Sequence, residues 1–231
     1  FAVSTQSAQM AASATKTIPI LFGAVTDPVE AQLVATIDKP GGNITGSSDQ
    51  WPVREQLLLL QEMAPGLKSI GVVHNPGEAN SEANMKVVRA LCREFGWTLV
   101  EAPAATTNDV YRAAASLKGR CDGMYVPASN TVIEAADAVA IAAAEAHVPV
   151  VAGEETAVQK GAIATFSINY ADIGRLNAQQ AVRILKGEAQ PGDLPVAVPT
   201  QFELVINRAA AARIGVDLPP QMIARAKRII E

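Results

Sequence analysis

Cysteine, histidine and aromatic residues are scarce in this chain of 231 residues. There are two cysteines and two histidines, and no pair of them has the spacing of metal ligands. We therefore expect no metal site and no cofactor. Cys92 and Cys121 could form a single disulfide, but two small buried thiols are the interpretation that we favour.

The chain also lacks a basic excess and a long apolar run. Its net charge is −4, and no basic patch stands out, so we expect no nucleic-acid partner. No apolar run approaches the length of a membrane span. No Gly-x-Gly-x-x-Gly pattern, P-loop or nucleophile elbow occurs, so neither a dinucleotide, a triphosphate nor a hydrolase is indicated.

Short apolar runs alternate with helical patterns along the chain, which is 49% hydrophobic and 18% charged. We expect strands at 1–3, 18–22, 44–46, 70–73, 97–101, 122–126, 147–151, 162–168, 196–198 and 203–206. Helical patterns occupy 8–14, 29–37, 53–63, 80–95, 108–117, 132–146, 173–185, 208–214 and 220–230. This alternation predicts an α/β protein with parallel sheets.

Polar residues follow several of these strands, where open α/β sheets bind small ligands. Each lies in a loop beyond the carboxyl end of a strand, and all could converge on one crevice. The candidate ligand-binding residues are Ser4, Thr5, Thr26, Asp27, Asn75, Asn80, Ser81, Ser129, Asn130 and Glu154.

Most of these candidates have two interpretations. Asp27 could pair with a ligand ammonium group, or it could cap a helix that begins at Val29. Thr5, Asn80 and Ser81 stand where helices begin, so they could face a ligand carboxylate or simply cap the helix. Ser129 and Asn130 have the same two interpretations, and Glu154 is a second candidate for the ammonium group.

Several motifs, taken together, are typical of one family. They lie at 17–22, 25–29 (Val-Thr-Asp-Pro-Val), 40–46 (Pro-Gly-Gly-Asn-Ile-Thr-Gly), 75–81 (Asn-Pro-Gly-Glu-Ala-Asn-Ser), 169–174 and 204–215. With them the chain resembles the tryptophan/tyrosine-type family of ABC-transporter substrate-binding proteins over essentially its whole length. The family pattern often has Gly-Thr-Pro where this chain has Ser4-Thr5-Gln6, and often an acidic residue at Ser129.

The resemblance implies two Rossmann-like lobes of the type I periplasmic binding fold, with a ligand cleft between them. It implies a monomeric extracytoplasmic binding protein, not an enzyme, with an amino acid as ligand, which in known members of the family is often aromatic. Its partner would be the membrane permease of an ABC transporter. In this interpretation Asp27 holds the ligand ammonium group, and the helix starts at Thr5 and Ser81 hold the carboxylate.

We expect lobe one at 1–47 and 165–190 and lobe two at 48–164 and 191–231. Family members normally begin with a signal sequence and a further strand–helix–strand–helix portion. We therefore expect the N-terminal part of the first lobe, and a signal peptide for secretion or lipid anchoring, to precede Phe1.

The sequence alone is also compatible with two other functions. A ligand-sensing domain of a regulator has the same fold and would follow a DNA-binding helix-turn-helix. A racemase would need two acid/base groups facing each other, for which His74 is close to the expected crevice and His147 is not. Trp51 lies nearer than Trp97 to the expected crossing between lobes.

Overall fold

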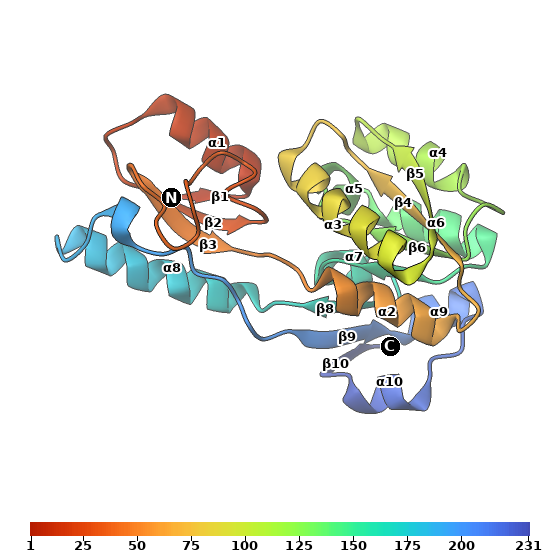
Figure 1. Cartoon of the computed structure of the whole chain (residues 1–231). Helices are drawn as coiled ribbons and strands as arrows, with labels where there is room; N and C mark the ends of the chain where they lie inside the picture. Colours follow the sequence, from red (N-terminus) through yellow and green to blue (C-terminus); the bar gives the residue numbers. More distant parts are fainter. The chain divides into compact units, whose positions relative to one another are not determined.

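The computed structural model describes all 231 residues and divides the chain into two compact units (Figure 1). Unit 1 contains Phe1–Gln50 and Ile168–Gln201, and unit 2 contains Trp51–Ser167 and Phe202–Glu231. The chain therefore passes between the two units three times, after Gln50, Ser167 and Gln201.

Unit 1 is a small parallel sheet with two helices. Strands β1 (Ala2–Val3), β2 (Ile20–Val25) and β3 (Ile44–Ser48) pair in the order β1-β2-β3. Helices α1 (Thr5–Ala14) and α8 (Tyr170–Leu185) lie on opposite sides of these strands in Figure 1, and a short 3-10 helix, η1 (Pro191–Asp193), follows α8. Phe22 is fully buried in its core because it projects from the middle strand.

Residues 191–201 belong to unit 1, which corrects the expectation that they lie in the second lobe. The Thr45 hydroxyl donates to the Leu194 carbonyl at 2.7 Å. The Ser48 amide donates to the Ala197 carbonyl at 2.8 Å, and Val196 packs in the core of unit 1. The expected strand at 196–198 is reduced to one bridge, between Ser47 and Ala197.

Unit 2 has a seven-stranded sheet in the order β10-β9-β8-β7-β6-β4-β5. All neighbouring strands are parallel except β8 and β9, which are antiparallel. The strands are β4 (Ser69–His74), β5 (Thr98–Pro103), β6 (Gly123–Val126), β7 (Val150–Ala152), β8 (Ala164–Ser167), β9 (Glu203–Asn207) and β10 (Arg228–Ile230). The helices are α2 (Val53–Met63), α3 (Ala79–Phe95), α4 (Thr107–Ala115), α5 (Asn130–Glu134), α6 (Ala136–Ala146), α7 (Glu155–Gln159), α9 (Arg208–Ile214) and α10 (Pro220–Arg225).

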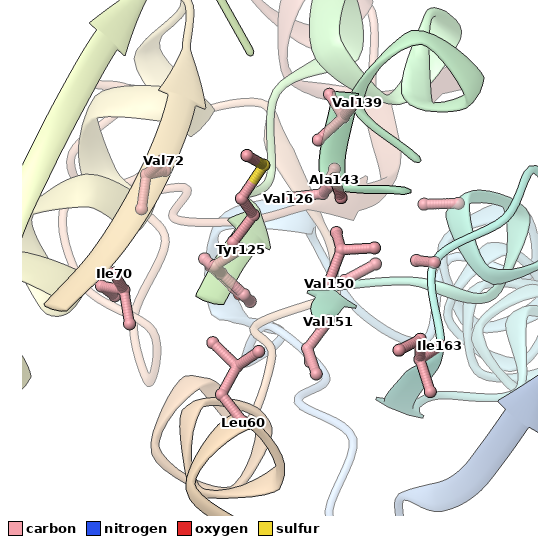
Figure 2. Packing of buried hydrophobic residues seen from close by; sticks show 14 of the residues in the cluster. Leu60, Ile70, Val72, Tyr125, Val126, Val139, Ala143, Val150, Val151 and Ile163 are labelled. Atoms are coloured by element: carbon pink, nitrogen blue, oxygen red, sulfur yellow. The ribbon is translucent and has the colours of Figure 1, made fainter. Parts of the chain in front are cut away.

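The core of unit 2 explains why its strands are short continuous apolar runs. Parallel strands that are covered by helices on both faces bury every side chain. In Figure 2, Leu60 of α2 and Ala143 of α6 lie on either side of β6 and β7, and Val150 and Val151 project from β7 between them. These four side chains are fully buried. The α/β prediction is therefore confirmed.

Two predicted helices differ from the structure. Residues 29–37 form turns, in which Gln32 has a φ of 58°. The helix predicted at 132–146 is broken at Ala135 into α5 and α6. There the Lys160 ammonium donates to the Ile133 and Glu134 carbonyls at 3.0 and 2.7 Å, which satisfies the end of α5.

Helix starts also differ from the prediction. Glu78, not Asn80 or Ser81, is the N-cap of α3. Thr106 caps α4, with Asp109 as the third residue of a capping box. Asn169 caps α8, which begins at Tyr170 and so ahead of the predicted start at residue 173.

Cys92 and Cys121 are free and buried, so the disulfide alternative is wrong. Burial raises the pKa of each thiol to about 11, which keeps both protonated and unreactive at neutral pH. We expect the unfolding midpoint to be the same with and without a thiol reductant. A Cys92→Ala/Cys121→Ala variant should be similarly insensitive to reductant. A midpoint that falls in reductant, as when a disulfide worth about 2–5 kcal/mol is lost, would contradict this expectation.

Candidate ligand-binding site

The carboxyl ends of the three strands of unit 1 lie at one edge of its sheet, because the strands are parallel. Ser4 and Thr5 follow β1, and Thr26 and Asp27 follow β2. The structure thus brings these four predicted residues to one edge, and it adds Asp49 after β3.

Asp27 caps a turn. Its Oδ1 accepts hydrogen bonds from the amides of Val29 and Glu30 at 3.1 and 2.9 Å. This is the capping role that the sequence left open, although the capped segment is a turn and not a helix.

Asp49 is the more unusual carboxylate of unit 1. Asp49 is only 6% exposed, and its Oδ2 accepts a hydrogen bond from the Tyr170 hydroxyl at 3.1 Å. Its Oδ1 is buried and accepts none, and no cation pairs with it. Burial raises the pKa of Asp49, and the hydroxyl groups of Tyr170 and Thr26 partly oppose that rise. Asp49 was not among the residues predicted from the sequence, although it follows β3 directly.

Helix α1 begins beside this edge with an open N-terminus. Ser4 is its N-cap, with a φ of 80°, and its side chain makes no capping hydrogen bond. The Ser4 hydroxyl lies 3.3 Å from that of Ser7, and the first turn contains no acidic residue. Thr5 is buried at the start of the helix. An N-terminus of this kind favours an anion.

The predicted site residues of unit 2 near Glu78 form hydrogen bonds that join the loop after β4 to the loop after β6. The buried Glu78 carboxylate accepts hydrogen bonds from the Ser129 hydroxyl at 2.7 Å and from the Thr131 amide and hydroxyl at 3.0 and 2.7 Å. The Asn75 side chain donates to the Thr131 hydroxyl at 2.9 Å, and the Asn75 amide donates to the Ser81 hydroxyl at 3.2 Å. These side chains already have hydrogen-bond partners, and the N-cap residue of α3 is the acidic Glu78.

The remaining candidates of unit 2 differ in exposure. Asn80 is buried and donates to the Ala128 carbonyl at 2.6 Å, while its Oδ1 accepts no hydrogen bond. Asn130 is exposed in the first turn of α5. Glu154 is buried and is the N-cap of α7, at the carboxyl end of β7.

His74 lies between two carboxylates. Its Nδ1 and Nε2 each lie 3.1 Å from a carboxylate oxygen, of Glu82 and Glu101 respectively. Arg89 bridges the same two carboxylates at 3.1 and 2.7 Å, and it lowers the pKa of Glu101. His147 is exposed and ends α6 in a left-handed conformation, so it does not begin a strand as predicted. The carboxylates beside His74 are thus those of Glu82 and Glu101, and neither of them is a predicted site residue.

Comparison with known proteins identifies the family. The family model for ABC transporter substrate binding proteins matches residues 1–230. A curated relative, the tyrosine-binding protein of Clostridioides difficile (strain R20291), is 38% identical over 207 residues, which are 90% of this chain and 60% of that protein. The chain belongs to the family of ABC transporter substrate binding proteins, and it spans 60% of the length of this relative.

Solved structures agree with this assignment. An ABC domain from Streptococcus pneumonia in complex with L-Trp is 31% identical, with a TM-score of 0.92 over 99% of this chain and 77% of that one. A conserved domain protein from Vibrio cholerae is 41% identical, with a TM-score of 0.94 over 98% of this chain and 76% of that one. The fold is therefore of the type I periplasmic binding class. LacI family regulators share only the fold, as in a case at 16% identity with a TM-score of 0.55.

None of the helices combines the length and the apolar character that crossing a membrane requires. A groove of about 400 Å³ lies along α8 in unit 1. Its lining includes Ile168, Asp172 and Val198 but none of the predicted site residues. The polar strand ends are therefore a better candidate site than this groove.

Proposed function

We propose that this chain is the ligand-binding part of an extracytoplasmic solute-binding protein of an ABC importer. It binds an amino acid, of which aromatic ones are the leading candidates, and delivers it to a membrane permease. Family membership supports the transport role. The two relatives whose names state a ligand, tyrosine in one and L-Trp in the other, support the ligand class.

Asp49 is the observation that carries the proposal. A carboxylate that is buried without a charge partner is costly, because its hydration is lost and hydroxyl groups such as that of Tyr170 replace only part of it. The α-ammonium group of an amino acid supplies both the missing charge and hydrogen-bond donors. We therefore assign the ammonium group to Asp49, in place of Asp27, and retain Glu154 as the alternative.

The open N-terminus of α1 at Thr5 remains our predicted contact for an anionic group of the ligand. Ser81 loses that role in the proposal, because it is fully buried within α3, whose N-cap is the acidic Glu78. Asn75 and Ser129 become residues that shape the loops, while Thr26, Asn80 and Asn130 stay predicted contacts.

A thermal-shift experiment tests the proposal. L-tyrosine, L-tryptophan or L-phenylalanine should raise the unfolding midpoint, since a ligand at 100 times its Kd stabilises the folded state by about 2.7 kcal/mol. N-acetyl-L-tyrosine keeps the ring and the carboxylate but has no ammonium charge, so it should raise the midpoint far less. If no amino acid shifts the midpoint, or if the acetylated form works equally well, the proposal is wrong.

A further inference from the structure

The Trp51 side chain lies on the loop at the carboxyl end of β7. At Gly153 in this loop, a Cβ atom would stand 1.8 Å from Cζ3 of the Trp51 ring and 1.9 Å from its Cε3. The ring therefore rests directly on the backbone at Gly153, and only glycine leaves room for it. Glu154, a predicted ligand residue, follows immediately.

The loop itself is held by a buried polar network. The Gln56 side chain donates to the Gly153 and Phe166 carbonyls, both at 2.8 Å. The fully buried Tyr125 hydroxyl donates to Gln56 Oε1 at 2.7 Å. Both the NH2 group and the carbonyl oxygen of the Gln56 side chain thus have hydrogen-bond partners. These hydrogen bonds fix the position of the loop.

Unlike the polar groups of this network, the indole N–H of Trp51 has no hydrogen-bond partner. Trp51 is 7% exposed, and its Nε1 is buried and has no hydrogen-bond partner. An indole N–H can only donate, so this group is available to an acceptor that a ligand brings. A buried donor without an acceptor is unfavourable, and strand ends of this kind are where α/β proteins bind ligands.

We propose that Trp51 contacts the ligand and determines its specificity, by donating its indole N–H to the ligand carboxylate. The inference rests on the proposed function and adds a residue to the site. The carboxylate is the strongest acceptor that an amino acid carries, and a charged acceptor strengthens a hydrogen bond. Gly153 is the supporting residue, because it allows the ring to lie where it does.

Trp51→Phe tests this contact, because it retains an aromatic ring and removes the N–H group. We expect the affinity for L-tyrosine, measured by calorimetry, to fall about 10- to 100-fold, as for a lost hydrogen bond to a charged group. The affinity for tyramine, which lacks the carboxylate, should hardly change. Trp97→Phe is the matched control, since Trp97 is also buried in unit 2 but packs against Phe95 at 4.8 Å between ring centroids.

Fluorescence gives a second measurement. The chain has two tryptophans, so the Trp97→Phe protein reports on Trp51 alone. With excitation confined to tryptophan, L-tyrosine should change its emission, and in the Trp51→Phe protein the emission should stay constant. If L-tyrosine binds but the Trp51 emission is unmoved, or if Trp51→Phe weakens tyrosine and tyramine equally, this inference is overturned while the proposed function stands. If L-tyrosine and the other amino acids do not bind the unsubstituted protein, the proposed function itself fails.

Discussion

Asp49→Asn is expected to weaken the binding of an amino acid by about 30-fold or more, since breaking a buried charge pair typically costs about 2–5 kcal/mol. Asparagine has nearly the shape of aspartate but no charge. The ligand ammonium group would then be buried without its counter-charge. Calorimetry with L-tyrosine or L-tryptophan, on the folded variant, measures the effect.

Asp27→Asn is the matched control, because it makes the same chemical change at the same edge of the sheet. Asparagine can accept the two backbone hydrogen bonds that Asp27 accepts in its turn. Affinity should therefore be nearly unchanged. If Asp27→Asn weakens binding and Asp49→Asn does not, the two carboxylates have the opposite roles, and if neither does, Glu154 becomes the candidate.

The stability of the ligand-free protein should change in the other direction. Because burial raises the pKa of Asp49, the folded state binds a proton there more readily than the unfolded chain does. The ionised carboxylate therefore destabilises the fold above that pKa, and the destabilisation is relieved as the pH falls through it. At neutral pH the unfolding midpoint of ligand-free Asp49→Asn should be unchanged or higher than that of the unsubstituted protein. A lower midpoint together with lower affinity would indicate general damage instead.

Ligand binding should also be sensitive to acid. The ammonium group requires the ionised form of Asp49, whose pKa lies above the ordinary range of an aspartate. Affinity should decline as the pH falls through that raised pKa. The acid sensitivity should be absent from Asp49→Asn, which has no carboxylate to protonate.

The general fold could be predicted from the sequence because its strands are local signals. Ile70 and Val72 belong to a continuous apolar run bounded by turn residues, and such a run predicts a covered parallel strand wherever it lies. The breaks in the pattern came from distant residues. Lys160 lies far along the chain from the helix end that it satisfies, so the sequence around Ala135 carries no sign of the interruption.

The site was only partly predictable for a similar reason. Because Asp27 and Ser129 follow predicted strands, the sequence placed both correctly in strand-end loops. It did not indicate which groups they form hydrogen bonds with. Asp27 accepts hydrogen bonds from amides of its own turn, and Ser129 donates one to a carboxylate that lies 51 residues away in the sequence. Asp49 was overlooked because its burial, and the lack of a partner for its Oδ1, are tertiary properties that no local spacing shows.

Glu78→Ala is expected to lower the free energy of unfolding by about 3 kcal/mol or more, since each buried donor left without an acceptor costs about 1–3 kcal/mol. Glu78 was absent from the predicted site, yet its carboxylate accepts three of the hydrogen bonds that join the loop after β4 to the loop after β6. Without it, the Ser129 hydroxyl and the amide and hydroxyl of Thr131 lose their acceptor in a buried region. Alanine also removes the acidic N-cap of α3, where a negative charge is favourable.

Glu145→Ala provides the comparison for Glu78→Ala, because Glu145 also accepts a hydrogen bond from a hydroxyl group, that of Tyr111, but on the surface. Its removal should change the unfolding midpoint little, since water replaces the lost acceptor. Ser129→Ala should fall between the two, because it removes one of the three hydrogen bonds together with the hydroxyl that donates it. Denaturant unfolding of the three variants gives this order directly. If Glu78→Ala is no more destabilised than Glu145→Ala, the two loops are not held by this carboxylate, and Asn75 and Ser129 return to the list of residues available to a ligand.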